Sequence, residues 1–405
     1  PQGKKFGIGK HDYWCGNHSN QNRITAWTGM ANIERPSYLQ KEPIIKRSRR
    51  KKYNIQDWFR ARKAKKFLKK QKKRQDKGNS DPFFLYLSFT TPHPRFRTNK
   101  HWLKKVNFDK VSIPPKDDEE SLHPTIRYQL IQKAWKWGVD PKNVKKTRAI
   151  YYAMVAETDA FIGYVLEQVK KLGLKENTYI IITADHGENN MEHDLFYKMN
   201  MYESSVNIPL YISGPDLQKG IMSEKIVSLV DLYPTILDMA KIPLDKSPYT
   251  FDGESLLPYL RGETNDTREW AFSIYTGTAC NTSVYMLREG DWKYIAYYGY
   301  KSQLFNLKED PDEIHNFAQE KPDIVAKMDK KLREICDIDR VHKEWQKYCK
   351  ESFREYRKKV RESPIPLFEY GAKNPHASYE DVIENTYKGF NEEDAEKLEE
   401  WLNSR

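Results

Sequence analysis

The sequence predicts an α/β fold, in which helices alternate with buried strands, followed by a small antiparallel sheet. Two short apolar segments, 83–89 (FFLYLSF) and 179–183 (YIIIT), have the length and the residue types of buried strands. The segment 145–172 between them has apolar residues at helical spacing. From residue 269 onward the pattern changes to short alternating strands separated by turns. Alternation of strands and helices is typical of a layered α/β core, and the later change indicates an added subdomain.

The helix predicted over 145–172 has one apolar face that can pack against a sheet. Gly173 follows this helix and ends it, because glycine readily adopts the left-handed conformation that closes many helices. The residues that recur on the apolar face are Ile150, Met154, Phe161, Val165, Val169 and Leu172.

The chain continues with another strand, a helix and a turn. Residues 208–212 form the second strand after the long helix, and a further apolar segment covers 226–230. A helix is predicted to start at Asp231, with Pro234 near its first turn. A turn follows at 252–253.

These patterns divide the chain into three units. Residues 1–268 form the α/β core, residues 269–335 an antiparallel subdomain, and residues 336–405 a charged helical tail. Within the subdomain, a turn at 289–291 divides the longest alternating stretch into two strands.

The composition is that of a globular protein, with 405 residues of which 38% are hydrophobic and 13% aromatic. No uninterrupted apolar segment reaches the roughly 18 residues that a membrane-spanning helix requires, so no membrane span is predicted. The four cysteines (Cys15, Cys280, Cys336 and Cys349) show no zinc-binding spacing, and their disulfide pairing is left open. The composition does not indicate an oligomeric state.

Glycosylation sequons suit an exported protein. They occur at Asn17, Asn265 and Asn281, of which Asn265 and Asn281 are the glycosylation candidates. The chain begins with Pro1 and not with Met, so we expect a signal peptide in a missing N-terminus and a secreted or lysosomal location.

The positive charge is concentrated in a basic helical insertion at about 46–77. This insertion holds 17 Lys and Arg residues against two acids, whereas the whole chain has a net charge of +12. Apolar residues at helical spacing favour an amphipathic helix with a solvated cationic face. They are Trp58, Ala61, Ala64, Phe67 and Leu68. The alternative is polyanion binding, and beside an anionic-substrate site the same charges would steer the substrate. Nucleic-acid binding is not predicted, because no nucleic-acid module accompanies this single insertion.

Chemically active side chains follow the strand 179–183. Asp185 and His186 come directly after it, and Gly187 lets the backbone turn without a Cβ clash. Because ligands bind at the carboxyl ends of strands in open α/β sheets, we expect these side chains to line a crevice. Lys198 follows in a polar loop. Taken alone, the Asp-His pair would more often be a helix cap and a loop histidine.

Two other segments supply complementary residues. Lys10 follows a short strand near the start of the chain, and His93 follows the segment 83–89 between two prolines. Hydrolysis of an anionic ester requires cations that neutralise the transferred group and an acid that protonates the leaving alkoxide. Two lysines, one histidine and a metal-binding pair meet that requirement.

Five motifs in this order resemble the type I sulfatase family of the alkaline-phosphatase-like superfamily. They are GIGK at 7–10, FLYLSFTTPHP at 84–94, TADHGE at 183–188, KMNMYE at 198–203 and VSLVDLYPTILDMAKIP at 227–243. The resemblance extends to about residue 316. It implies a mixed, mostly parallel sheet sandwiched by helices, a small C-terminal antiparallel sheet, and a sulfuric ester hydrolase activity.

The resemblance also implies a role for each residue. Asp185 and His186 would be ligands of one Ca²⁺ ion. Lys10 would contact the sulfate and the nucleophile, and Lys198 would be a second sulfate-binding lysine. His93 would contact the sulfate and assist departure of the alcohol. The nucleophile would be a formylglycine made from a cysteine in a C-x-P-S-R context.

The chain departs from the family pattern in three respects. No C-x-P-S-R or S-x-P-S-R occurs in the 405 residues, and the paired aspartates that complete the calcium site are absent. We therefore expect an N-terminally truncated chain, with the formylglycine upstream, that is inactive by itself. Many sulfatases have a histidine where this chain has Asp12. His11 and His18 are the alternatives, and we assign His18 to substrate binding. The nitrogen ligand His186 suits zinc or manganese better than calcium, so calcium rests on the resemblance.

Four segments resemble a glycosaminoglycan exo-sulfatase within the family: KHDYWCGNHSNQNRITAWT at 10–28, YYAMVAETDAFIG at 151–163, MEHDLFYKMNMYE at 191–203 and YMLREGDWKYIAYY at 285–298. This implies a sulfated glycosaminoglycan or another sulfate ester as partner, and a 2-sulfated uronate as the target group. The alternatives are a phosphodiesterase or phosphonate hydrolase of the same superfamily and an inert polyanion-binding relative.

Overall fold

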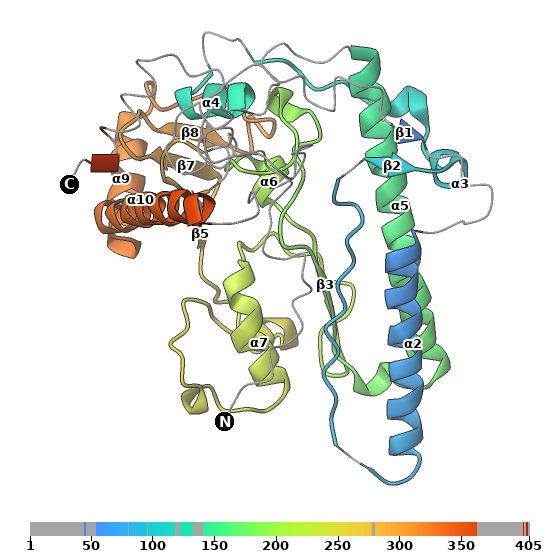
Figure 1. Cartoon of the computed structure of the whole chain (residues 1–405). Helices are drawn as coiled ribbons and strands as arrows, with labels where there is room; N and C mark the ends of the chain where they lie inside the picture. Colours follow the sequence, from blue (N-terminus) through green and yellow to red (C-terminus); the bar gives the residue numbers. More distant parts are fainter. Residues whose placement is uncertain are drawn as a thin grey trace.

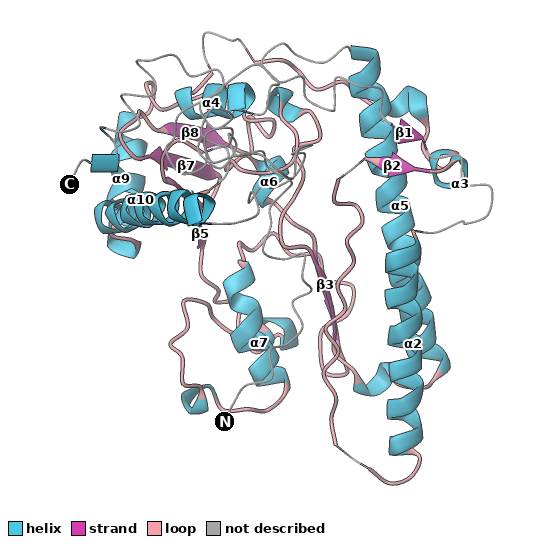
Figure 2. Cartoon of the chain, in the orientation of Figure 1, coloured by secondary structure: helices cyan, strands magenta, loops and turns pink. Residues whose placement is uncertain are grey.

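The structure, a computed structural model, describes residues 44–45, 54–79, 81–94, 96–117, 122–132, 141–277, 280–362, 400 and 402–403. Three long helices, a two-stranded antiparallel ribbon and a four-stranded antiparallel sheet account for most of the regular structure among the described residues (Figure 1). Long loops connect these elements (Figure 2).

Helices α2 (Ile55–Gln75) and α5 (Pro141–Lys171) pack side by side along one edge of the molecule (Figure 1). Their apolar faces form a single buried cluster, and small side chains on α2 allow a close approach. The cluster contains Ala61, Ala64, Leu68, Val165, Val169 and Leu174. The helix predicted for the basic insertion is therefore confirmed over 55–75, and residues 46–53 lie outside the described residues.

Helix α5 confirms the helix predicted over 145–172, although it begins four residues earlier, at Pro141. Ile150, Met154 and Phe161 on its apolar face are buried as expected. Gly173 ends the helix with a φ of 66°, in the left-handed region that favours glycine.

The segment 83–89 is not a buried strand, and that prediction was wrong. The segment is extended, and alternate side chains are half-buried and exposed, but no described strand pairs with it. Phe83 and its alternate neighbours pack against the cluster of α2 and α5, whereas Phe84 and Tyr86 are 69% and 81% exposed. The apolar pattern specifies which face packs, but a strand also requires a neighbour that accepts its hydrogen bonds.

The two strands predicted on either side of the Asp-His motif are confirmed. β3 (Ile180–Thr183) pairs antiparallel with β4 (Leu210–Ser213), with Thr183 opposite Leu210. Among the described residues, parallel pairing is limited to β1 (Ile44–Ile45) and β2 (Arg97–Thr98). The mostly parallel sheet therefore remains a prediction.

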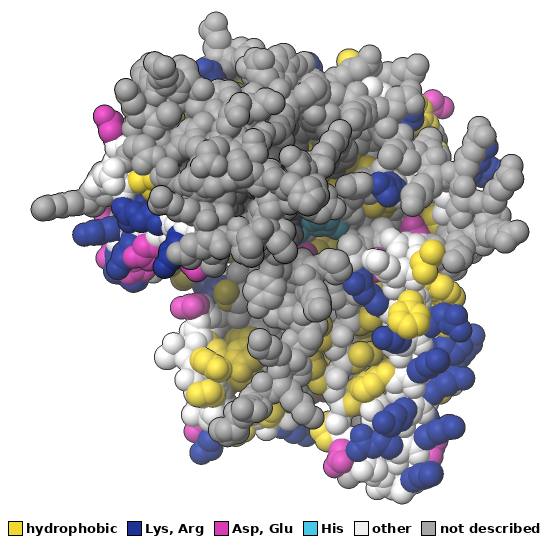
Figure 3. All heavy atoms as spheres, in the orientation of Figure 1, with side chains coloured by type: hydrophobic (Ala, Val, Ile, Leu, Met, Phe, Trp, Pro, Cys, Tyr) yellow, Lys and Arg dark blue, Asp and Glu magenta, His cyan; other side chains and the backbone are white. Residues whose placement is uncertain are grey.

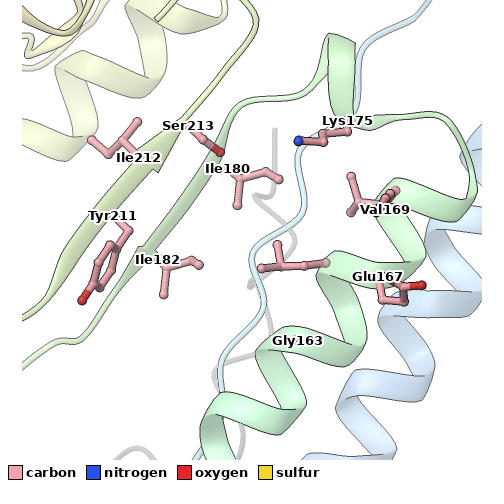
Figure 4. Close-up of a pocket in the computed structure, with 11 residues that line it drawn as sticks. Gly163, Glu167, Val169, Lys175, Ile180, Ile182, Tyr211, Ile212 and Ser213 are labelled. Carbon is pink, nitrogen blue, oxygen red and sulfur yellow. The ribbon is translucent and has the colours of Figure 1, made fainter. Parts of the chain in front are cut away.

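A pocket of about 470 Å³ lies between α5 and the β3–β4 ribbon (Figure 4). Gly163 and Val169 line it from the helix, and Ile180, Ile182 and Tyr211 line it from the strands. The ribbon therefore does not pack tightly against α5 along its whole length.

The predicted antiparallel subdomain is a four-stranded sheet with neighbouring strands in chain order. Its strands are β5 (Trp270–Tyr275), β6 (Val284–Glu289), β7 (Trp292–Tyr297) and β8 (Gln303–Asn306). Met286, Ile295 and Phe305 on one face belong to the main core, whereas Tyr285 and Leu304 on the other face pack against α9 (Pro322–Ile335). The sheet is therefore a layer shared by the core and the C-terminal helices.

The remaining helices surround these layers. Asp231 precedes α7 and Pro234 lies in its first turn, as predicted. The charged tail predicted for 336–405 is described chiefly over 338–362, and residues 363–399 lie outside the described residues. The remaining α-helices of the described residues are α3 (Lys100–Leu103), α4 (Pro124–Gln132), α6 (Glu203–Val206), α7 (Leu232–Met239), α8 (Leu257–Arg261), α9 (Pro322–Ile335) and α10 (Ile338–Glu362).

Candidate active site

Asp185 and His186 lie directly after β3, where the chain turns away from the ribbon. The turn is held by Gly187, whose backbone N–H donates to the Ser205 carbonyl over 2.8 Å. A Cβ at this position would lie 2.1 Å from the Ser204 carbonyl oxygen, so only glycine allows this approach. The backbone that follows the two chemically active residues is thereby held against α6.

His93 and Lys198 approach each other from segments 105 residues apart. The Lys198 ammonium donates to Nε2 of His93 over 3.2 Å, and Nδ1 of His93 lies 2.8 Å from the Pro94 carbonyl oxygen. Because a lysine ammonium can only donate, Nδ1 carries the imidazole proton and Nε2 accepts. This arrangement corresponds to a neutral histidine beside a cation.

His186 joins this pair to the Asp185 carboxylate. The rings of His93 and His186 have centroids 6.1 Å apart, and Nε2 of His186 lies 3.6 Å from Asp185 Oδ2. Nδ1 of His186 donates to the Gly187 carbonyl over 2.7 Å, which leaves the lone pair of Nε2 available. Four residues predicted from three sequence segments are therefore close in space.

The surroundings of His93 lower the pKa of its imidazole below the usual range. Partial desolvation of the ring contributes most, and the positive charge of Lys198 adds to it. The Pro94 carbonyl acts in the opposite direction and raises the pKa. An anion bound between His93 and Lys198 would favour the protonated imidazole, because opposite charges stabilise each other.

Glu188 anchors the loop that carries Lys198. The Glu188 carboxylate accepts hydrogen bonds from the backbone N–H groups of Asn190 and Tyr197. Burial raises the pKa of Glu188 to about 7, although these hydrogen bonds and Lys198 lower it. Tyr197 and Met199, on either side of Lys198, have φ of 70° and 104°. This strained backbone directs the lysine towards His93.

Sequence reasoning missed the residue that holds the His93 loop. The buried Asp57 carboxylate of α2 accepts from the backbone N–H groups of Thr90 and Thr91, over 3.0 and 2.9 Å, and from the Thr91 hydroxyl. Arg60 forms an ion pair with the same carboxylate over 2.6 Å. The available signal was an isolated acid at the start of a strongly cationic helix.

A second missed group connects the Lys198 loop to the C-terminal sheet. Lys293 of β7 is fully buried, and its ammonium lies 2.9 Å from Glu203 and 2.6 Å from Glu313. Glu203 begins α6, five residues after Lys198. Nothing in the sequence around this lysine indicates its burial, because its partners lie 20 and 90 residues away.

The described residues do not contain a complete metal site. Within the described part of the chain, no group of three or more His, Cys, Asp or Glu side chains could hold a metal ion. Ca²⁺ takes six to eight oxygen ligands, and Asp185 and His186 together offer one carboxylate and one nitrogen. The Asp185 side chain is 88% exposed, so it is accessible to a cation whose coordination shell is completed by other ligands.

Several predicted residues cannot be placed. Lys10 and His18 lie outside the described residues, as do His11 and Cys15. Both glycosylation candidates are described. Asn265 is exposed, whereas Asn281 is half-buried and its amide donates to the Tyr300 hydroxyl.

The described cysteines are separate thiols. Cys280, Cys336 and Cys349 form no disulfide, and burial raises the pKa of the Cys280 thiol to about 12. None of the helices in the described ranges combines the length and the apolar character needed to cross a membrane.

Comparison with known proteins agrees with this geometry. The Sulfatase family profile matches residues 6–242, and a profile described as N-sulphoglucosamine sulphohydrolase, C-terminal, matches residues 191–337. The chain is 37% identical to arylsulfatase K of Bos taurus over 377 residues, which cover 87% of this chain and 68% of the relative. It is also 37% identical to arylsulfatase K of Homo sapiens over 378 residues, covering 87% and 69%.

Solved structures share the fold. The phosphonate monoester hydrolase of Silicibacter pomeroyi superposes with a TM-score of 0.55 at 24% identity, over 63% of this chain and 56% of that one. A structure described as a 2-O GAG sulfatase gives a TM-score of 0.54 at 20% identity, over 83% and 74%. A protein in complex with D-glucosamine-2-N,6-O-disulfate gives 0.53 at 23% identity, over 70% of each chain. The Sulfatase profile matches more than half of the chain, and the identity to both arylsulfatase K relatives extends over most of it. The chain therefore belongs to the sulfatase family and is a sulfuric ester hydrolase.

Proposed function

We propose that the protein removes sulfate from a sulfated glycosaminoglycan, with a 2-sulfated uronate as the target group. The observation that carries this proposal is the contact of 3.2 Å between His93 Nε2 and Lys198 Nζ, beside Asp185 and His186. An acid, a cation and a metal-binding carboxylate at one point suit cleavage of an anionic ester. The identity to relatives named arylsulfatase K supports the same chemistry.

His93 and Lys198 have separate roles in this proposal. Lys198 donates to a sulfate oxygen and offsets the charge that develops during transfer. His93 takes up a proton when the anionic ester binds, and then gives it from Nε2 to the departing alcohol oxygen as the sulfur–oxygen bond breaks. The alcohol leaves neutral and His93 returns to its neutral form.

Other groups complete the site in this proposal. Asp185 and His186 would hold one side of a Ca²⁺ ion, which would supply positive charge opposite the sulfate. A formylglycine supplies the nucleophile. Lys10 and His18 contact the sulfate and the substrate. We also propose a secreted or lysosomal location with glycosylation at Asn265, whose side chain is exposed.

The test is sulfate release by the full-length protein that contains these residues. We expect turnover of a 2-sulfated uronate disaccharide, and a loss of about 100-fold in kcat/KM for Lys198→Ala, because a charged hydrogen bond contributes about 1.5–3 kcal/mol. His93→Ala should reduce kcat by about 10²–10⁴-fold. Lys219→Ala is the matched control, because Lys219 is exposed beyond the opposite end of the β3–β4 ribbon.

Two results would contradict the proposal. Faster cleavage of a phosphonate monoester than of any sulfate ester would assign the site to phosphoryl chemistry. Equal losses for Lys198→Ala and Lys219→Ala would remove Lys198 from the site.

A further inference from the structure

The exposed face of α2 carries a row of cations that the proposed hydrolysis does not use. We call the row formed by Arg62, Lys66, Lys69 and Lys73 the cationic stripe. All four side chains are exposed, and Figure 3 shows Lys and Arg gathered over this part of the molecule. Further exposed cations flank the stripe at Lys63, Lys70 and Lys77.

The spacing of the cationic stripe places it on a single helix face. Its members stand at positions i, i+4, i+7 and i+11, which lie nearly in line on an α-helix. Ala61, Ala64 and Leu68 lie on the opposite side, where they pack against α5. The packing of α2 therefore involves none of the stripe, which extends about 16 Å along the helix at 1.5 Å per residue.

The charge of the cationic stripe is not neutralised within the described part of the chain. No acidic side chain there forms an ion pair with any of its four members. The two acids of this region are both engaged elsewhere, Asp57 with the His93 loop and Asp76 with Lys72. Like charges three and four residues apart destabilise a helix. The mutual repulsion of these positive charges therefore destabilises the folded chain, and an anionic partner would offset that repulsion.

The anchoring of α2 connects the cationic stripe to the candidate active site. Asp57, one turn before Arg62, holds the backbone of Thr90 and Thr91, and the His93 N–H donates to the Thr90 carbonyl over 2.8 Å. A chain bound on the stripe is therefore held by the same rigid unit that positions His93.

Nucleic acid fits this face less well. Binding of single strands uses aromatic side chains on which bases stack. Phe59 is the exposed aromatic residue of α2, and the Lys63 ammonium lies 4.6 Å from its ring centroid and covers that face. The stripe consists mainly of lysines, which act as point charges for a flexible polyanion.

We propose that the cationic stripe is an exosite that binds the sulfated polysaccharide chain at a distance from the ester that is cleaved. This inference rests on the proposed function, because it takes its ligand from the same substrate class. It adds a second binding region that acts on long chains and not on disaccharides.

The experiment compares a long sulfated oligosaccharide with a sulfated disaccharide on the full-length protein. The variant Arg62→Gln/Lys66→Gln/Lys69→Gln/Lys73→Gln removes the stripe and keeps good helix formers. We expect the Kd for the long chain to rise at least tenfold, and the slope of log Kd against log salt to fall by about three, as expected when about four ion contacts are lost. Hydrolysis of the disaccharide should not change.

Two further variants control for charge and folding. Lys327→Gln/Lys330→Gln/Lys343→Gln/Lys347→Gln removes the same charge from exposed positions on α9 and α10, and it should leave long-chain binding unchanged. Arg62→Lys/Lys66→Arg/Lys69→Arg/Lys73→Arg keeps the charge and should retain binding. Helical circular dichroism shows whether each variant folds.

The outcomes separate the two proposals. Equal losses for the stripe variant and the α9–α10 variant would overturn the exosite, as would an unchanged Kd for the long chain. Competition by RNA of equal charge at lower concentration than the sulfated chain would also overturn it, in favour of nucleic acid. Absence of disaccharide hydrolysis in every protein, with stripe-dependent binding intact, would instead contradict the proposed function and leave polyanion binding standing.

Discussion

At the scale of single residues, His93 determines how the proposed activity depends on pH. Desolvation and Lys198 hold the pKa of His93 below its usual 6.5 in the free protein. The protonated imidazole is the required acid, so its fraction falls as pH rises through this lowered pKa. We therefore expect kcat/KM to decrease with rising pH, with an apparent pKa below 6.5. Lys198→Ala removes a positive charge that lowers the pKa of His93. In the residual activity of this variant, the decrease of kcat/KM should therefore occur at higher pH, and we call this decrease the alkaline limb of the pH–rate profile.

The pH–rate profile is measured on the disaccharide with full-length protein. Lys219→Ala serves as the control and should leave the limb in place. A limb that stays at the same pH in Lys198→Ala would show that the acid is not His93.

His123 makes a separate contribution to the pH dependence of stability. It is buried, Nε2 lies 2.9 Å from the Lys301 carbonyl oxygen, and burial lowers its pKa to about 4. The unfolded chain binds a proton near pH 6.5 and the folded chain does not, so stability is lost as pH falls below 6.5. We expect a loss of about 2 kcal/mol between about pH 7.5 and pH 5.

Urea unfolding at the two pH values tests this expectation. His123→Gln should remove most of the difference, and His315→Gln, at an exposed histidine, should retain it. A pH dependence that is unchanged in His123→Gln would assign the effect to other groups.

At the scale of elements, the first turn of α2 supports the loop that carries His93. Asp57→Asn keeps the size of the side chain but removes a buried charge that accepts from Thr90, Thr91 and Arg60. We expect the free energy of unfolding to fall by about 2–4 kcal/mol, together with a lower kcat, because the His93 loop loses its anchor. Denaturant unfolding and initial rates measure the two effects.

Asp76→Asn is the matched control, at the exposed end of the same helix, where the carboxylate pairs with Lys72. This variant should change stability by less than about 0.5 kcal/mol. If both variants behaved alike, Asp57 would be an ordinary helix acid with no role in positioning the loop.

The elements differ in how far the sequence could predict them. Helix α5 follows from the spacing of Ile150, Met154 and Phe161, because an amphipathic helix needs only local periodicity and one surface to cover. The same reasoning failed at 83–89, because strand pairing depends on neighbours that are distant in sequence. β3 was predicted correctly because β4 follows within thirty residues and supplies a partner.

The residues of the candidate site also differ in how far the sequence could predict them. Asp185, His186 and His93 could be selected as candidates because each directly follows an apolar segment or lies between prolines, and Lys198 because it lies in the motif KMNMYE. Asp57 and Lys293 could not be selected, because Asp57 is defined by Thr90, 33 residues away, and Lys293 by Glu313 and Glu203, 20 and 90 residues away. A lone charged residue has the same appearance in the sequence whether it is buried or exposed.

At the scale of the whole molecule, Lys293 joins the C-terminal sheet to the start of α6. Its ammonium is fully buried between Glu203 and Glu313. Lys293→Met would leave these carboxylates without their partner, and we expect a loss of about 3–5 kcal/mol of unfolding free energy. Adding Glu313→Gln should recover part of this loss, because it removes one of the uncompensated charges.

Lys327→Met is the control, since Lys327 is 72% exposed and pairs with Glu289 at the surface. It should cost at most about 1 kcal/mol. A comparably small loss for Lys293→Met, measured by the same denaturation, would mean that the sheet and the core are not coupled through this lysine.

The extended segment 83–89 has a consequence for how these residues behave at high protein concentration. Phe84 and Tyr86 face the solvent, and no described strand pairs with the backbone between them. Such a segment can accept a strand from another molecule, as exposed sheet edges do. Self-association of this kind grows with concentration, whereas cleavage of a bound ester does not depend on it. Dilution of the protein should therefore weaken strand pairing between copies of the chain, whereas binding of a ligand in excess should not change with protein concentration.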